Sequence, residues 1–564
     1  MQKTVRCCYQ NSICIIAFIF GLATQSLKSQ DLENIDKQQP IKLSGGLSVL
    51  GNFYSVSGIP PRSKPFMWSI NGSPTLTILG VSLPFYFNVG AQNSSFSQPF
   101  NQFGVSPHYK WLTAHLGYRS LNFSSHTLSG IVMLGGGLEV RAKKFRFAAI
   151  AGRINKAVRA DTSQSFVSQQ PAFKRMGFSA KIGVGTENNY FDIIVLKAKD
   201  EAASYLDAPL RLTPAENVVL GINSKLLLFK HFNLGFEVAG SAYTRNNLLD
   251  SINYKDVPIE LRTIMHINIS TQLLFAGNAY IGYTSKYINL KLNYKRVDQD
   301  FNSMGAYIFQ TDLESFTVEP SFNLFKNKVR LSGSIGIQRD NLLRNKLSTT
   351  ERTIGSVNLS VQPGRKYGLD IQYGNYGIIQ RAGVIPLNDT TRLAIANQNV
   401  SAINRYSLSN VNRAVNVVLL LMYQELSSLN PFQSDQLGSN VMVGNLTTTY
   451  SLLKTGQNFT GGFNYSRTSF LSGEALLIGP SLGIGRAFLN KKLVTGINFS
   501  YMLNQFNGIT AGSVINGGVN LNYRLSKTHN FLANLRLTHN GSTSPVSLPF
   551  TEMWFSAGYQ FNFF

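Results

Sequence analysis

The chain has 564 residues, a formal net charge of +24 and only 14% charged residues, and its mean hydropathy is −0.03. Soluble proteins average about 25% charged residues. A mean hydropathy near zero excludes both a helical membrane protein and a disordered chain. The low charge, the aromatics and the 48 glycines together indicate many β-strands.

The first 29 residues read as a cleavable secretory signal. Lys3 and Arg6 precede an apolar run at 13–23, and the polar stretch TQSLKSQ follows it. An N-terminal helical anchor is the alternative, but it needs about 20 apolar residues. We therefore expect a signal peptide at 1–29 and a short periplasmic segment at 30–42.

All three cysteines lie inside the expected signal, at Cys7, Cys8 and Cys14. The mature chain then has no disulfide, no thiolate nucleophile and no cysteine-ligated metal. An exported chain without cysteine fits the Gram-negative envelope better than a eukaryotic ectodomain.

Beyond the signal, apolar and polar residues alternate with a period of two. Val519, Leu521 and Tyr523 form one such row, and no apolar run approaches 20 residues. Short turns join these segments in pairs. We predict twelve of them: 79–80, 110–114, 142–145, 185–189, 229–232, 284–287, 325–328, 363–366, 411–414, 454–458, 489–492 and 526–530.

Longer polar segments separate the pairs. Alternating short turns and long loops are typical of an outer-membrane barrel with periplasmic turns and extracellular loops. Twelve turns with both termini periplasmic predict a single closed antiparallel transmembrane barrel at 43–564, with about 26 strands (24–28). Strands begin by about residue 43, so we expect no plug domain. The long loops are expected at 156–170, 200–213, 244–267, 298–311, 378–399 and 428–438.

The chain ends in GYQFNFF, where aromatic and amide residues alternate. The aromatics are expected to face lipid as an interfacial girdle, and the amides the lumen. This end resembles the C-terminal β-signal of outer-membrane proteins, which implies recognition by the barrel-assembly machinery. The residues that carry the resemblance are Gly558, Tyr559, Phe561, Phe563 and Phe564.

Three further segments resemble a large outer-membrane barrel family from Bacteroidetes. They are GVSPHYKWLTAHLGYRSL (104–121), NSMGAYIFQTDLESFTV (302–318) and GSIGIQRDNLL (333–343). The resemblance implies the fold and the outer-membrane location, and it carries no catalytic residue.

Motifs for chemistry are scarce. The seven histidines have no metal-ligand spacing, and neither a phosphate loop nor a serine-nucleophile elbow appears. The glycines at 135–137 lie inside a strand pattern and lack the helix of a phosphate cradle. We therefore expect no catalytic residue, metal or cofactor, and no enzymatic activity.

Strand parity places some charges on the inner wall. A base on the lipid face near the bilayer midplane costs about 2–4 kcal/mol, so the inward choice is favoured. These charges line a hydrated wall or, in a more specific interpretation, a selectivity or docking surface. The candidates are Glu139, Arg141, Glu237 and Asp370.

Many bases lie at the expected periplasmic turns. Export through a signal peptide removes nucleic acid as a partner. Solvated turn residues are the simplest interpretation, and contact with anionic lipid headgroups or an acidic periplasmic partner is the functional one. The bases are Arg141, Lys143, Lys144, Lys230, Lys326, Lys328, Arg365, Lys366, Lys491, Lys492 and Lys527.

Twenty-six strands about 4.8 Å apart and tilted by about 40° give a barrel roughly 50 Å wide. A hole of that size must be filled, and we expect infolded loops such as 244–267 and 378–399 together with partner envelope proteins. The favoured function is a wide conduit or docking scaffold in the export or assembly of envelope or surface proteins. A diffusion porin is the alternative, and a lipid-modifying enzyme the weakest one.

Overall fold

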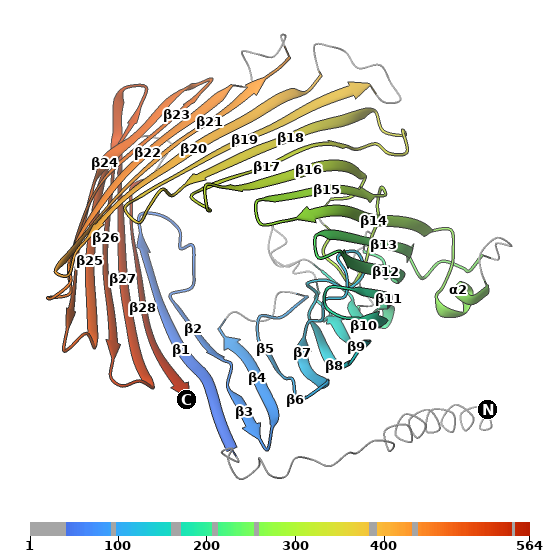
Figure 1. The fold of residues 1–564 in the computed structure, drawn as a ribbon. Helices are drawn as coiled ribbons and strands as arrows, with labels where there is room; N and C mark the ends of the chain where they lie inside the picture. Colours follow the sequence, from blue (N-terminus) through green and yellow to red (C-terminus); the bar gives the residue numbers. More distant parts are fainter. Residues whose placement is uncertain are drawn as a thin grey trace.

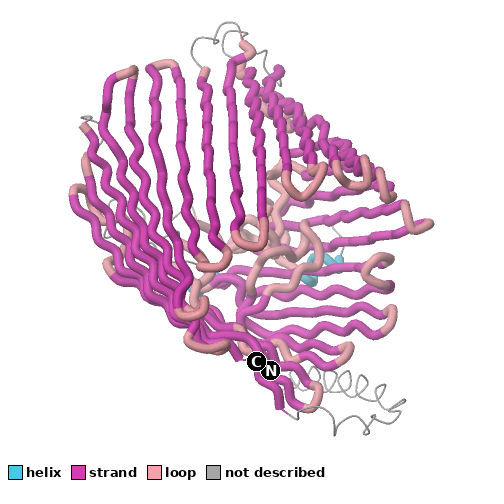
Figure 2. The backbone as a smooth tube through the Cα atoms, turned by 60° about the vertical axis from the view of Figure 1, so that its left-hand side comes forward, coloured by secondary structure: helices cyan, strands magenta, loops and turns pink. Residues whose placement is uncertain are grey.

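The computed structural model describes residues 41–91, 97–159, 171–205, 212–252, 259–308, 310–382, 392–430, 438–543 and 548–563. One antiparallel sheet contains every strand and curls until its ends meet (Figures 1 and 2). The first strand pairs with the last over thirteen residue pairs, from Gly45↔Phe563 to Ser57↔Thr551. The barrel is therefore closed.

The first half of the barrel contains shorter strands and all the interruptions. Its elements are β1 (Ile41–Ser57), β2 (Phe66–Gly72), β3 (Thr75–Ile78), β4 (Val81–Gly90), β5 (Gln102–Val105), β6 (His108–Tyr109), β7 (Leu112–Arg119), β8 (Met133–Ala142), β9 (Phe145–Asn155), β10 (Lys174–Gly185), β11 (Tyr190–Glu201), the 3-10 turn η2 (Ala202–Ser204), β12 (Glu216–Leu228), β13 (Phe232–Thr244), α2 (Ile259–Ile264) and β14 (Thr271–Thr284).

The second half is more regular, with strands of 10 to 16 residues. They are β15 (Ile288–Val297), β16 (Leu313–Leu324), β17 (Val329–Arg339), β18 (Ser348–Val361), β19 (Tyr367–Ala382), β20 (Ala394–Ser409), β21 (Arg413–Ser428), β22 (Ser439–Leu452), β23 (Gln457–Phe470), β24 (Gly473–Phe488), β25 (Leu493–Phe506), β26 (Ile509–Arg524), β27 (His529–Ser542) and β28 (Phe550–Phe563).

The 28 segments amount to 26 barrel strands, as predicted, because two strands are each split by a proline. β2 and β3 both pair with β1 and β4, and Pro74 lies between them. β5 and β6 both pair with β4 and β7, and Pro107 lies between them. Proline has no N–H for the ladder, so each break is local and the strand resumes beyond it.

All twelve predicted short turns separate consecutive strands at one end of the barrel. Several place a non-glycine residue in the left-handed region, among them Lys143, Lys230, Lys326 and Lys491. The turn before β11 closes differently: the Thr186 N–H donates to the Asn189 carbonyl at 2.7 Å, next to Gly185 at φ +126°. Tight two- to five-residue connections of this kind fix the register of each hairpin.

The predictions for the long connections were partly wrong. The loop expected at 378–399 is shorter, because β19 continues to Ala382 and β20 begins at Ala394. Two connections at the same end, 471–472 and 507–508, are tight turns. A connection that was not predicted as a loop, 120–132, is long and lies inside the barrel.

The connection 245–270 does not close the mouth as expected. Its buried Met265 and Ile267 pack on Val218 and Ala242, which point out of the barrel, and α2 lies outside the wall in Figure 1. On the same outer face Glu216 lies 3.3 Å from Lys199. The apolar residues of this connection are only partly buried: Met265 and Ile267 are covered, but Leu248 is 66% and Leu249 40% exposed.

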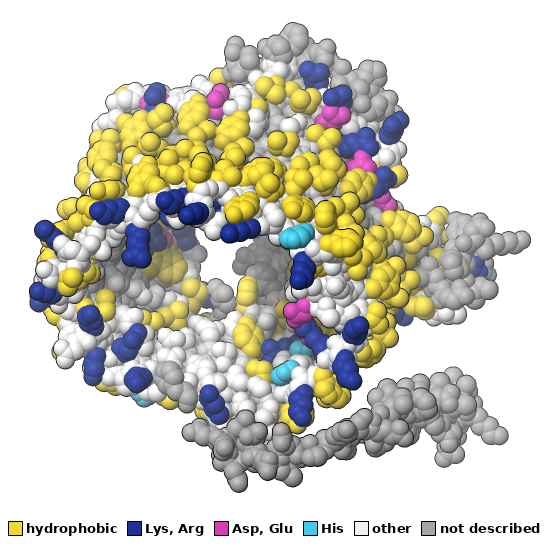
Figure 3. All heavy atoms as spheres, in the orientation of Figure 1, with side chains coloured by type: hydrophobic (Ala, Val, Ile, Leu, Met, Phe, Trp, Pro, Cys, Tyr) yellow, Lys and Arg dark blue, Asp and Glu magenta, His cyan; other side chains and the backbone are white. Residues whose placement is uncertain are grey.

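The rest of the outer wall is apolar. Outward side chains such as Leu220, Ile335 and Leu482 are 60–64% exposed, and Figure 3 shows apolar side chains gathered on the visible part of the outer wall. So much exposed apolar surface is unfavourable in water and fits a lipid environment. No helix in the described ranges is long and apolar enough to cross a bilayer. The expected signal peptide and the absence of a preceding plug domain lie outside the described residues.

Candidate functional site

Within one sector of the wall, β9–β14, apolar residues lie on both faces. On β11 the outward Ile193 is 49% exposed, whereas Ile194 and Leu196 face the lumen and are fully buried. The sequence FDIIVLKA around them is a nearly continuous apolar run, which is typical of a strand that is covered on both sides. That run is a sequence signal for cover on the lumen face, and sequence reasoning missed it.

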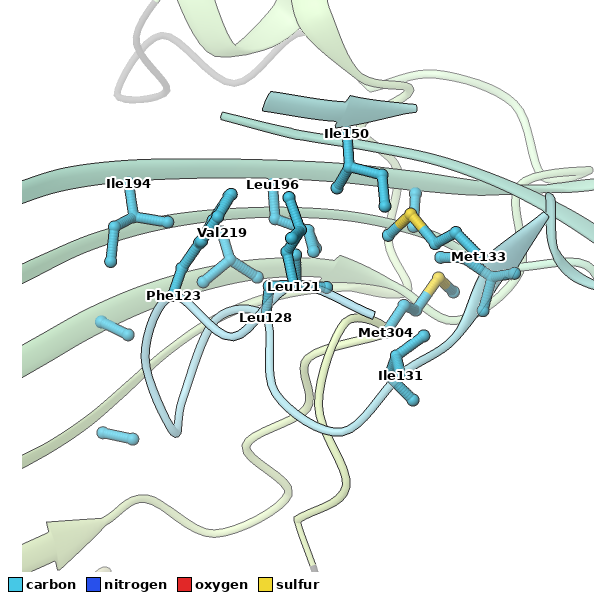
Figure 4. Packing of buried hydrophobic residues seen from close by; sticks show 14 of the residues in the cluster. Leu121, Phe123, Leu128, Ile131, Met133, Ile150, Ile194, Leu196, Val219 and Met304 are labelled. Atoms are coloured by element: carbon cyan, nitrogen blue, oxygen red, sulfur yellow. The ribbon is translucent and has the colours of Figure 1, made fainter. Parts of the chain in front are cut away.

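The connection 120–132 covers this sector from inside the barrel (Figure 4). Leu121, Phe123, Leu128 and Ile131 are buried in one cluster with the wall. The connection contains no charged residue, and thirteen residues without charge are unusual for a solvated loop. Burial of its apolar side chains is the driving force for folding inward.

A second connection, 298–312, joins the first. Phe301 and Met304 belong to the same cluster. The Ser129 N–H donates to the Gly305 carbonyl at 2.9 Å, and the Ser303 hydroxyl donates to the Thr127 carbonyl at 2.7 Å. The two connections therefore form one unit, which we call the lumen plug (residues 120–132 and 298–308).

Two buried polar residues of the wall hold the plug. The Asn217 amide oxygen accepts from the Met304 N–H at 3.0 Å, and its amide nitrogen donates to the Ser241 hydroxyl at 2.8 Å. Ser241 in turn donates to the Asn302 carbonyl at 2.5 Å. Because unpaired polar groups are costly in a buried site, these bonds specify one docked position for the plug.

Close packing restricts one plug position to glycine. A Cβ at Gly305 would lie 2.1 Å from Leu196 Cδ1 and 2.6 Å from the Thr127 carbonyl oxygen. Neither contact is possible for a real side chain, so any other residue at 305 must shift Leu196 of the wall and the plug backbone at Thr127.

Glu237 is the charged anchor of the plug. Its carboxylate accepts from the Ser125 hydroxyl and the His126 N–H, both at 2.7 Å. The His126 ring is 4% exposed, meets Phe301 edge-to-face, and has no hydrogen-bond partner at Nδ1. Burial lowers the pKa of His126, the Glu237 charge opposes that shift, and the Lys295 charge reinforces it.

A second charged group lies on the same wall closer to the short turns. Arg146 makes two 2.8 Å bonds to Asp192, whose side chain is 1% exposed. Lys181 lies 3.9 Å from Asp192 and covers the Phe123 ring at 5.0 Å. The plug therefore lies against both an apolar patch and a charged network.

The four predicted lumen charges do not form one site. Glu139 lies between His115 at 3.1 Å and Arg141 at 3.3 Å. Glu237 anchors the plug, and Asp370 pairs with Arg405 on β20, far along the sheet. Their role as a selectivity or docking surface stays a prediction. Sequence reasoning missed Asn217, Ser241 and Gly305. An isolated Asn, Ser or Gly in a strand or loop does not indicate that another segment docks on it.

Beyond the plug, the described residues leave part of the lumen face uncovered, and its lining is polar. A lumen pocket of ≈ 790 Å³ at β12–β18 is lined by Tyr280, Lys291, Glu319 and a row of serines and asparagines. Figure 3 shows an opening through the middle of the molecule. Among the described residues, no group of three or more His, Cys, Asp or Glu side chains could hold a metal ion.

The C-terminal strand β28 closes the barrel against β1. Tyr559 and Phe561 share the outward face with Phe531 of β27, and the Phe531 and Tyr559 rings are 5.0 Å apart. The Phe561 and Phe563 rings are 4.8 Å apart, and Gly558 packs on Leu50 of β1. Phe564 lies outside the described residues, and recognition by assembly machinery stays a prediction.

Closure, the apolar outer belt and the polar lumen are the features of a barrel that crosses a lipid bilayer. The chain is a transmembrane β-barrel. No protein-family model and no curated protein sequence matches it, so membership of a Bacteroidetes family stays a prediction.

Solved outer-membrane barrels are similar to it only remotely. A mutant ferric enterobactin receptor (PfeA) from Pseudomonas aeruginosa is 10% identical with a TM-score of 0.42, over 93% of this chain and 80% of that one. The P pilus usher (PapC) translocation pore is 12% identical with a TM-score of 0.33, over 92% and 99%. OccK11 from Pseudomonas aeruginosa is 9% identical with a TM-score of 0.31, over 93% and 100%. Likenesses this remote carry no argument about function.

Proposed function

We propose that the protein is an outer-membrane conduit for a large substrate in the export or assembly of envelope or surface proteins, and that the lumen plug is its gate. The role is one of passage and docking, without catalysis. Partner envelope proteins occupy the part of the lumen that the plug leaves open.

The observation that carries this proposal is the plug itself. It is a separate layer held on one wall by buried hydrogen bonds to Asn217, Ser241 and Glu237. The opposite wall has no such cover in the described residues, and an opening remains (Figure 3). A barrel roughly 50 Å wide exceeds what a small solute needs.

Single-channel conductance of the purified full chain tests the proposal. We expect a large, unstable conductance that rises further in Gly305→Leu, because the new side chain cannot coexist with Leu196 and Thr127. Met265→Ala, which disturbs only the connection on the outer wall, is the matched control and should conduct like the parent. Affinity purification from native membranes should recover partner envelope proteins.

A diffusion porin is the second candidate, favoured by the serine- and asparagine-lined wall of the lumen pocket. It predicts a steady conductance with a sharp solute-size limit, no stable partner and no effect of Gly305→Leu. A protein that is monodisperse, closed in bilayers and free of partners would overturn the conduit proposal.

A further inference from the structure

The rim of twelve short turns carries almost only positive charge. Between the strand ends it holds thirteen Lys and Arg residues and a single acid, Glu187. The connections at the opposite end hold equal numbers of bases and acids by sequence, eleven of each. The bases of this short-turn rim are Lys110, Lys143, Lys144, Lys230, Lys286, Lys326, Lys328, Arg365, Lys366, Lys454, Lys491, Lys492 and Lys527.

These bases occupy nine of the twelve turns, spread over most of the circumference. Figure 3 shows Lys and Arg side chains around the opening, with few acidic ones among them. A docked protein would contact one sector of the rim, and the positive charge would then be confined to that sector. A partner that surrounds the whole barrel explains charge in nearly every hairpin.

The same turns present exposed apolar side chains beside the bases. Phe229 is 85% exposed next to Lys230, and Phe325 is 74% exposed next to Lys326. Lys286 covers the Tyr287 ring at 5.4 Å, and Lys110 covers the Tyr109 ring at 5.1 Å. An apolar side chain that enters the acyl boundary beside an ammonium at headgroup level suits an anionic lipid.

Backbone conformation adds an independent observation. Five of the lysines adopt a left-handed φ between +52° and +68°, where glycine or asparagine is less strained. A turn selected only for tight reversal would favour Asn or Gly at these positions. Phe229, Phe325 and Leu489 share the left-handed φ with the lysines of their turns, so the strained positions keep both the base and its apolar neighbour. The five are Lys110, Lys143, Lys230, Lys326 and Lys491.

We propose that the short-turn rim binds the phosphates of anionic phospholipids in the leaflet at that end of the barrel, as a ring of Lys–phosphate contacts. Each contact is made by an ammonium above an apolar anchor. The ring fixes the depth and orientation of the barrel in the membrane, independently of what passes through the lumen.

The test compares two triple variants of the full chain. K230N/K326N/K491N removes three rim cations and relieves the three left-handed lysines. K64N/R245N/R344N removes three exposed cations from the opposite end and is the matched control. Both proteins are placed in vesicles of pure phosphatidylcholine and of phosphatidylcholine with phosphatidylglycerol, and bound lipid is counted by native mass spectrometry.

We expect the parent and the control to retain phosphatidylglycerol over phosphatidylcholine by roughly fivefold per lysine contact, with the preference fading at high salt. The rim variant should retain fewer phosphatidylglycerol molecules than the parent, by the share that its three removed lysines held, yet melt no earlier than the parent in pure phosphatidylcholine. Equal lipid preference in the parent and the rim variant would overturn the proposal. Loss of an acidic protein from native membranes with unchanged lipid binding would overturn it in favour of a protein partner.

Discussion

The β9–β14 wall and the β22–β27 wall belong to one sheet, and on both walls side chains point alternately to lipid and lumen. The two walls differ in what lies on their lumen face. On the first, inward residues such as Ile194 and Leu196 are buried beneath the plug. On the second, Asn445 donates to Asn464, and Thr538 donates to Asn516 at 3.0 Å, and no buried apolar cluster of the described residues covers them. Alternation therefore gives the direction of a side chain, whereas the chemistry of the inward row determines whether a layer covers it.

The difference also separates two kinds of stability. The covered wall gains from apolar burial and close packing, which are sensitive to single substitutions. The uncovered wall faces water, where a lost side-chain hydrogen bond is replaced by a bond to solvent. Matched substitutions on the two walls should therefore differ strongly in effect.

Removal of packing beneath the plug should have the largest effect. Leu128 is fully buried, so Leu128→Ala should weaken plug docking by about 2–5 kcal/mol. Hydrogen exchange of residues 120–132 in the detergent-solubilised barrel measures it. Leu477→Ala, at a half-buried inward position of β24, is the control and should change little. Equal responses at the two sites would contradict the distinction between the walls.

Much of this fold could be predicted from the sequence, because strand parity and turn chemistry are local. The twelve turns and 26 strands follow from residues such as Gly185, Gly456 and the alternation before them. The plug could not, because its burial depends on contacts between residues more than a hundred positions apart, such as Ser125 with Glu237. The connection 245–270 was expected inside the lumen, but a barrel wall offers two faces to cover, and Met265 and Ile267 cover the outer one.

Loss of the charged anchor, Glu237, should have the second-largest effect on plug docking. Glu237→Gln keeps the shape but weakens two hydrogen bonds to a charged acceptor, and bonds of this kind are worth about 1.5–3 kcal/mol each. Protease cleavage within the plug should become faster. Glu319→Gln is the control: it removes a half-exposed carboxylate 3.7 Å from Lys291. It should lower the free energy of unfolding by at most about 1 kcal/mol. If Glu319→Gln speeds cleavage within the plug more than Glu237→Gln does, Glu237 is not the anchor of the plug.

Acidification should loosen the plug by a smaller amount. Burial lowers the pKa of His126 below its ordinary 6.5, so the undocked plug binds the proton more tightly than the docked one. Docking is therefore fully stable above about pH 6.5 and weakens as the pH falls toward the lowered pKa of the docked state. Conductance measured from pH 7.5 downward should rise accordingly.

His126→Phe is the control for that pH dependence, since a second aromatic ring can face Phe301 without titrating. Conductance of this variant should vary less with pH than that of the parent. An identical pH profile in the two proteins would assign the effect to other groups.

The smallest effect is expected on the uncovered wall. Asn464→Ala removes the acceptor of the Asn445 side chain, but water can replace it on a wet surface. The thermal stability of the purified barrel should therefore change by no more than about 0.5 kcal/mol. Because partner proteins are proposed to fill this side of the lumen, the same variant has a second use in native membranes. There the polar row would be buried against the partner, so Asn464→Ala should reduce the amount of co-purified partner while leaving the isolated barrel unchanged. A variant that destabilises the isolated barrel by several kcal/mol would show that this wall too is covered by its own chain.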